Sequence, residues 1–302
     1  MLVLWLRITC LLLGLCGAVA QAAGPEEAEQ KAFDEARKVA RDGPADVVLA
    51  SQAMLKLPAG MLFVPQPQAT ALLNAMGNPG RDDALQGLVF PAGDGGWFMT
   101  VRFEPSGYIK DDDAKGWNVD DLLKSYQEGT EASNEERLKM GVPALEVLGW
   151  AEKPAYDAVT HRLAWAMSSR HKGAPAGEPQ GVNYNTYVLG REGYFSMNLI
   201  TGLDQLPAHR PVAQTLLQSL AFDEGKRYAD FKSGTDKVAE YGLAALVVGV
   251  AAKKLGLIAI VLAFMAKFAK VIFLAVAGFG AVAAKFWKRD KKNAPTDSNP
   301  TT

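Results

Sequence analysis

VNYNTYVLGREGYFSMNLIT (residues 182–201) contains two runs rich in Tyr, Val, Phe and Ile, separated by a turn from Gly190 to Gly193. Aromatic and β-branched residues favour strands, and a short Gly-containing interval between two such runs is typical of a β-hairpin. The stretch therefore predicts two antiparallel strands, which we expect to form part of a mainly antiparallel sheet.

Other segments predict more strands and several helices. Residues 96–104 alternate apolar and mixed positions, so Trp97, Met99, Val101 and Phe103 share one strand face. Further strands are predicted in 144–152, in 160–169, and in 47–65, where two strands lie on either side of Pro58–Gly60. Helices are predicted in 26–44, 67–80, 118–141 and 207–220, and Asn118 is expected as the N-cap of the third. Together these elements predict an α+β fold, with a mainly antiparallel sheet covered by helices.

The first 23 residues carry one early cation, Arg7, then an apolar run and small residues, which is the pattern of a secretory signal peptide. Both cysteines, Cys10 and Cys16, fall inside it. We therefore expect an exported domain at 24–236 without cysteine, which excludes disulfides, CxxC redox chemistry and zinc ribbons. Whether the signal peptide is cleaved stays open.

The C-terminal part has a different composition. It predicts a basic amphipathic helix at 237–270, a transmembrane helix at 271–287, and a basic, then disordered, tail at 288–302. Lysines and arginines after a span favour the cytoplasmic side. We therefore expect a single-pass protein of the bacterial inner membrane, with the domain in the periplasm and the C-terminus in the cytoplasm. Insertion of 241–266 into the membrane remains an alternative.

Small residues repeat along the basic helix at spacings of three and four, and Gly242, Gly249 and Gly256 belong to this series. Small residues at such spacing let helix backbones approach closely in membranes. The pattern predicts helix packing, either in self-association or with another envelope membrane protein, in addition to contact with membrane lipid.

Charge is distributed unevenly between the two parts. From Gly24 to Asp236 the sequence has 30 acidic and 21 basic residues, a net charge of −9, whereas the whole chain has −1. An acidic domain is a poor candidate for binding nucleic acid, and it favours cations, basic peptides or a protein partner.

The run GYIKDDDAKGWNVDD (107–121) places three aspartates between two lysines. The calcium-loop template fails, because Lys115 and Leu122 occupy ligand positions. In an extended segment Asp111 and Asp113 would share one side and could hold a hard cation if a third ligand came from elsewhere. A ligand- or partner-binding loop and a solvated turn before the helix are the alternatives.

Motifs of the common enzyme classes are missing. The sequence has no G-x-S-x-G, no P-loop and no G-x-G-x-x-G. His161 falls in a predicted strand and is most simply a sheet residue. We expect no cofactor and favour a protein that is not an enzyme.

GYIKDDDAKGWN, GTEASNEER, LGREGYF and GKRYADFKSGTDKVAEYG together resemble a bacterial family of uncharacterised membrane-anchored proteins, defined by a domain of unknown function, over about residues 46–287. The resemblance implies a Gram-negative envelope protein with a periplasmic domain and a C-terminal anchor, and it implies no activity. The pattern falls on glycines 107, 129, 190 and 193 and on candidate ligand- or partner-binding residues: Tyr108, Lys110, Asp111, Asp112, Asp113, Lys115, Trp117, Thr130, Asn134, Arg137, Asn183, Tyr184 and Arg191.

Three hypotheses follow. The leading one is a membrane-anchored periplasmic binding or adaptor protein that presents the acidic loop to a partner. The alternative is an envelope hydrolase using Asp111 and Asp113, with or without a divalent cation. In the third, the basic helix itself senses or deforms anionic lipid.

Overall fold

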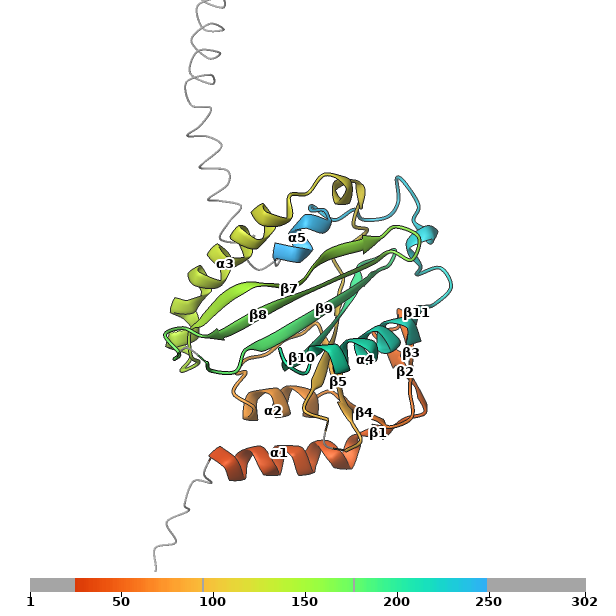
Figure 1. The fold of residues 1–302 in the computed structure, drawn as a ribbon. Helices are drawn as coiled ribbons and strands as arrows, with labels where there is room; N and C mark the ends of the chain where they lie inside the picture. Colours follow the sequence, from red (N-terminus) through yellow and green to blue (C-terminus); the bar gives the residue numbers. More distant parts are fainter. Residues whose placement is uncertain (1–24, 94, 176, 249–302) are drawn as a thin grey trace, which may run out of the picture.

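The computed structural model describes residues 25–93, 95–175 and 177–248 (Figure 1). The segments predicted as signal peptide, transmembrane helix and tail lie outside these residues, as do Gly249, Gly256 and most of the predicted basic helix. Within the described residues, no helix combines the length and the apolar character needed to cross a membrane.

A large antiparallel sheet organises the fold, with strands in the spatial order β1-β4-β5-β6-β10-β9-β8-β7 (Figure 1). Its strands are β1 (Arg41–Asp42), β4 (Met61–Pro65), β5 (Leu85–Pro91), β6 (Phe98–Glu104), β7 (Leu145–Asp157), β8 (Arg162–His171), β9 (Gly181–Leu189) and β10 (Tyr194–Gly202). A smaller antiparallel sheet has the order β11-β3-β2 and consists of β2 (Ala45–Leu49), β3 (Ala53–Leu57) and β11 (Leu220–Phe222). The predicted α+β fold with a large antiparallel sheet is confirmed.

The quoted hairpin is formed by β9 and β10, with Leu189 opposite Tyr194. The turn closes with a hydrogen bond of 2.8 Å from the Gly190 amide to the Gly193 carbonyl oxygen. A Cβ atom at Gly193 would lie 1.9 Å from the carbonyl oxygen of Glu104 on the neighbouring strand β6. The turn therefore needs glycine there, because only a residue without a side chain can approach β6 so closely.

Helices α1 (Pro25–Val39), α2 (Gln68–Ala75), α3 (Val119–Lys139), α4 (Leu206–Ser219) and α5 (Leu243–Val248) complete the described fold, with short 3-10 helices η1 (Asp112–Lys115) and η2 (Tyr228–Asp230). One face of the large sheet packs against α4 and the small sheet, and the predicted apolar face of β6 is buried in that core. On the other face, α1 and α2 cover the β4–β5 end, and α3 and α5 cover the β7–β9 end (Figure 1).

Two differences from the sequence prediction have local causes. The segment 47–65 contains parts of three strands, because β2 and β3 are joined by a tight turn at Ala50 and Ser51 with φ of +52° and +51°. Such turns are normally signalled by Gly or Asn, which tolerate positive φ, and this turn has neither. The second difference is strand β5, which the sequence pattern does not predict. Its pairing with β6 is irregular, since the register shifts between Leu85 and Gly87.

Helix α3 begins as predicted, since the Asn118 side chain accepts hydrogen bonds from the amides of Asp120 (2.9 Å) and Asp121 (3.4 Å). Near its other end, Asn134 is only 5% exposed. Its side chain donates to the Leu145 carbonyl oxygen at 2.9 Å and accepts from the Leu145 amide at 2.8 Å. The Asn134 side chain thus joins α3 to β7 with the same donor and acceptor pair that the backbone of a neighbouring strand would provide.

The packed domain continues beyond the boundary predicted at residue 236. Leu243, Leu246 and Val247 of α5 are at most 1% exposed and belong to the same core cluster as Leu122 of α3 and Trp165 of β8. Helix α5 therefore belongs to the domain core, and the helix in this segment begins at Leu243 and not at 237.

Replacing Asn134 with Ala should destabilise the domain by about 2 kcal/mol, because it leaves a partly buried backbone donor and acceptor of Leu145 without their side-chain partner. Urea unfolding of the purified chain measures this change in the free energy of unfolding. The control is Asn183→Ala, at an exposed position of β9, for which we expect at most about 0.5 kcal/mol. Equal effects of the two changes would contradict the assigned role of Asn134.

Candidate functional site

The aspartate run leads into the 3-10 helix η1, with Asp111 at its N-cap and Asp112 and Asp113 in its first turn, and is not an extended segment, so Asp111 and Asp113 do not act as a pair. The Asp113 carboxylate accepts hydrogen bonds from the amides of Leu243 (3.0 Å) and Ala244 (3.1 Å) at the start of α5. A Cβ atom at Gly242 would lie 2.4 Å from Asp113 Oδ2. Asp113 thus caps α5, and the absence of a side chain at Gly242 makes room for the cap.

The residues before the aspartates bind the C-terminal segment through the backbone. The Tyr108 amide donates to the Lys237 carbonyl oxygen at 2.8 Å, and the Ala239 amide donates to the Tyr108 carbonyl oxygen at 2.8 Å. Gly107 has φ of +92°, and a Cβ atom there would lie 2.6 Å from the Lys237 oxygen. Glycine is needed here for its conformation and for the close approach of the two backbones.

The hairpin turn holds the same segment by a charged pair. Arg191 Nε and Nη2 bind the two carboxylate oxygens of Asp236, each at 2.7 Å, and Nη1 donates to the Gly225 carbonyl oxygen at 3.1 Å. The Arg191 and Asp236 side chains are 19% and 11% exposed. The guanidinium and the Lys232 amide hold the pKa of Asp236 well below its usual range.

We call this set of contacts the C-terminal clamp and define it by Gly107, Tyr108, Asp113, Arg191 and Asp236. It joins three of the stretches that carry the family resemblance: the acidic loop, the hairpin turn and the stretch 225–242. Four of the pattern residues, Gly107, Tyr108, Asp113 and Arg191, therefore converge because they hold one segment of chain in place.

A second cluster lies beside the clamp, around His161. The Tyr156 hydroxyl donates to Asp111 Oδ2 at 2.8 Å and lies 3.0 Å from His161 Nδ1. Because the hydroxyl has a single hydrogen, its oxygen accepts from Nδ1–H, which leaves Nε2 of a neutral His161 as the basic nitrogen. Burial lowers the pKa of His161, while Asp111 and Asp157 oppose that shift.

His161 is a residue that the sequence interpretation missed. It was expected within a strand, but it ends the turn between β7 and β8 with φ of +53°, which is unusual for a residue with a side chain. Its ring stacks on Tyr228 at 3.9 Å between centroids, and Tyr108 stacks on Tyr228 at 4.3 Å and on Phe231 at 3.9 Å. The only indication of this cluster in the sequence was its aromatic residues, which lie at distant positions in the chain.

The other predicted site residues divide into buried and exposed groups. Tyr184 is 1% exposed in the core beneath α4, Trp117 packs against the cluster that contains α5, and Thr130 donates to the Tyr126 carbonyl oxygen within α3. The exposed residues are Lys110, Asp112 and Asn183; the side chain of Lys115 lies outside what the structure describes. These residues do not form one site.

The arrangement gives no support for a metal at Asp111 and Asp113. Each carboxylate is directed to a different partner, Tyr156 in one case and the start of α5 in the other. In the part of the chain that the structure describes, no three His, Cys, Asp or Glu side chains are grouped so that they could hold a metal ion.

The described residues thus define an α+β domain in which several of the pattern residues hold the C-terminal segment in place. The chain belongs to a protein family described as "Protein of unknown function (DUF2167)", which matches residues 41–278. Comparison with curated protein sequences gave no match.

Two solved structures are distantly similar to the chain. The first is the solution structure of cyanobacterial PsbP (CyanoP) from Synechocystis sp. PCC 6803, with 11% sequence identity and a TM-score of 0.37; the match covers 70% of this chain and 99% of that chain. The second is the Saccharomyces cerevisiae Ran-binding protein Mog1p, with 10% sequence identity and a TM-score of 0.32; the match covers 59% of this chain and 94% of that chain. Both TM-scores are below 0.5, so neither likeness bears on what this chain binds.

Replacing Arg191 with Met should loosen the clamp and reduce the acid sensitivity of the fold. Because the folded pKa of Asp236 is lowered, its contribution to stability is present above about pH 4 and is lost as the pH falls below it. The variant should therefore lose less stability than the wild type on acidification, and amides in 225–244 should exchange faster. Urea unfolding across pH and hydrogen exchange measure both effects. Arg170→Met, which removes a half-exposed pair with Glu146, should change neither.

Replacing Asp111 with Asn should lower the pKa of His161 further. Asn keeps an acceptor for the Tyr156 hydroxyl but removes the negative charge that lies 3.9 Å from His161 Nδ1 and opposes the effect of burial. NMR titration of the ring protons is feasible because the chain has 3 histidines. A pKa of His161 that rises in the variant would contradict the assigned geometry.

Proposed function

We propose that this chain is a membrane-anchored binding or adaptor protein of the bacterial envelope. In this proposal the domain is exported to the periplasm, the segment 271–287 crosses the inner membrane once, and the C-terminus is cytoplasmic. The partners are membrane lipid and either a second copy, packed through Gly249 and Gly256, or another envelope membrane protein.

The C-terminal clamp is the observation that carries the proposal. A domain that was only tethered would need a flexible linker, yet here the chain is held by hydrogen bonds, an ion pair and buried apolar side chains up to Val247. The basic, apolar sequence begins directly after this point. The attachment of the chain up to Val247 fixes where the basic segment leaves the domain, which suits an adaptor whose binding surface must face a fixed direction.

The acidic loop supports a role in binding. Asp111 and Asp113 serve the fold, whereas Asp112 between them is exposed, and the structure gives its carboxylate no partner among the described residues. A loop that presents a free carboxylate on an acidic domain suits a partner with positive charge.

The hydrolase alternative has less support. It draws on Asp111 and Asp113, and both carboxylates already accept hydrogen bonds from the protein itself. Use of Asp113 as a nucleophile or base would compete with its cap on α5, and use of Asp111 would compete with its hydrogen bond from Tyr156.

Photo-crosslinking in cells tests the proposal. A photoreactive amino acid at position 112 of the full-length chain should capture one recurrent envelope protein, identified by mass spectrometry, in the membrane fraction. The matched control is position 46, an exposed aspartate of β2, which should not capture that protein. Equal capture from both positions, or recovery of the chain only in the soluble cytoplasmic fraction, would refute the proposal.

A further inference from the structure

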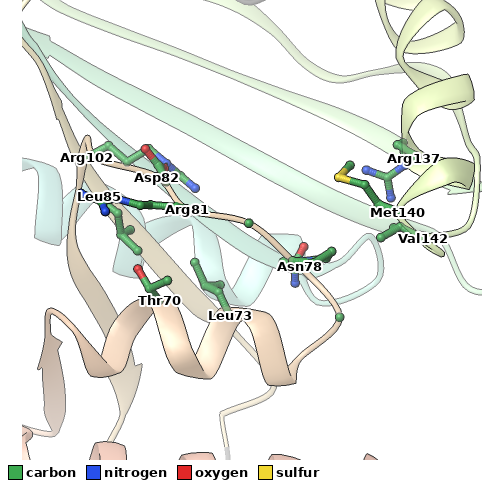
Figure 2. Close-up of a pocket in the computed structure, with 13 residues that line it drawn as sticks. Thr70, Leu73, Asn78, Arg81, Asp82, Leu85, Arg102, Arg137, Met140 and Val142 are labelled. Carbon is green, nitrogen blue, oxygen red and sulfur yellow. The ribbon is translucent and has the colours of Figure 1, made fainter.

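A small pocket opens on the sheet face between the two groups of helices. Its walls come from the end of α2, the loop 77–85, strand β6 and the end of α3, and its volume is about 230 Å³. Figure 2 shows Arg81, Asp82 and Arg102 at one end, Arg137 with Met140 and Val142 at the other, and Asn78 between them. Three arginines from separate parts of the chain therefore line one cavity of an acidic domain (Figure 2).

The three guanidinium groups share one mode of attachment. Arg81 Nε binds Asp83 at 2.6 Å, Arg102 Nε binds Asp82, and Arg137 Nε donates to the Pro143 carbonyl oxygen at 3.0 Å. Among the described residues, the terminal nitrogens of Arg81 and Arg137 have no acceptor; Arg102 Nη1 donates to Thr100 Oγ1 at 2.5 Å. Each side chain is thus held by its Nε, while terminal N–H donors remain for a ligand.

The charge of the pocket is only partly compensated. Asp82 and Asp83 neutralise two of the three cations. The Arg81 side chain is 86% exposed, so water strongly weakens its ion pair with Asp83. Arg137 has no carboxylate partner in the part of the chain that the structure describes. The position of Arg137 near the C-terminal end of α3 explains why a positive charge is tolerated there. It does not explain why three arginines line the same pocket.

We propose that this pocket binds a phosphate group. Guanidinium groups recognise phosphate through two parallel N–H donors, and a phosphate offers three acceptor oxygens to donors that approach from different sides. The volume is below the roughly 300 Å³ at which sites for larger organic ligands begin, so a single phosphate group fits better than a nucleotide. Leu73, Leu85, Met140 and Val142 also line the pocket and offer apolar surface to an uncharged substituent.

The phosphate can come from a free small molecule or from the headgroup of a lipid, and the chemistry of recognition is the same. The inference deepens the proposed binding function and rests on it in one respect, namely that the domain binds its ligand without converting it. It does not depend on the orientation of the chain in a membrane or on a protein partner at Asp112.

Isothermal titration of the full-length chain with inorganic phosphate tests the inference. The protein is purified in a non-ionic detergent, and the ionic strength is kept constant with chloride so that general screening is the same throughout. Replacing Arg137 with Gln should weaken phosphate binding about tenfold or more, since it removes a charged donor. The control, Arg170→Gln, removes one positive charge from a side chain paired with Glu146 outside the pocket and should bind as the wild type does.

A second arm replaces phosphate with vesicles of phosphatidylcholine, with or without phosphatidylglycerol. Phosphate binding that depends on Arg137 supports a free ligand, and vesicle binding that depends on Arg137 and on phosphatidylglycerol supports a lipid headgroup. Equal binding by the wild type and Arg137→Gln in both arms, or no binding in either, would overturn the inference. Because position 112 is not involved, a failure here leaves the crosslinking result, and with it the proposed adaptor role, untouched.

Discussion

The ion pair between Arg191 and Asp236 is the interaction on which the attachment of the C-terminal segment to the sheet depends. It joins the turn of the central hairpin to the last segment that the structure describes. Both side chains are largely shielded from water, so their attraction exceeds that of an exposed pair. Arg191 reaches Asp236 because Gly193 lets the turn press against β6 at Glu104, and a side chain at Gly193 would force the two apart.

The clamp changes the interpretation of the acidic run. Three neighbouring aspartates have three different environments: Asp111 binds the Tyr156 hydroxyl, Asp112 faces solvent, and Asp113 caps α5. A cluster of acids in sequence is therefore not one chemical site. The 3-10 turn separates carboxylates that an extended strand would have placed on one side, which removes the geometric basis of the metal hypothesis.

Local patterns predicted much of the fold. The β9–β10 hairpin, the apolar face of β6 and the Asn118 cap of α3 were all visible, since each depends on neighbours within a few residues. The β2–β3 turn was not visible, because Ala50 and Ser51 adopt positive φ without the usual residues. His161 was placed in a strand for a similar reason: its neighbours look strand-like, and only the tight connection between β7 and β8 bends the backbone at this position.

The sequence by itself determined the strand and helix pattern and the contrast between an acidic domain and a basic C-terminal part, because composition and periodicity depend on residues that are close in the chain. Only the tertiary structure decided the partners of Asp113, which caps amides 130 and 131 residues away. It also decided that Arg81, Arg102 and Arg137 line one pocket. Contacts over such separations follow from how the helices and the sheet pack together, and periodicity within one element does not report on that packing.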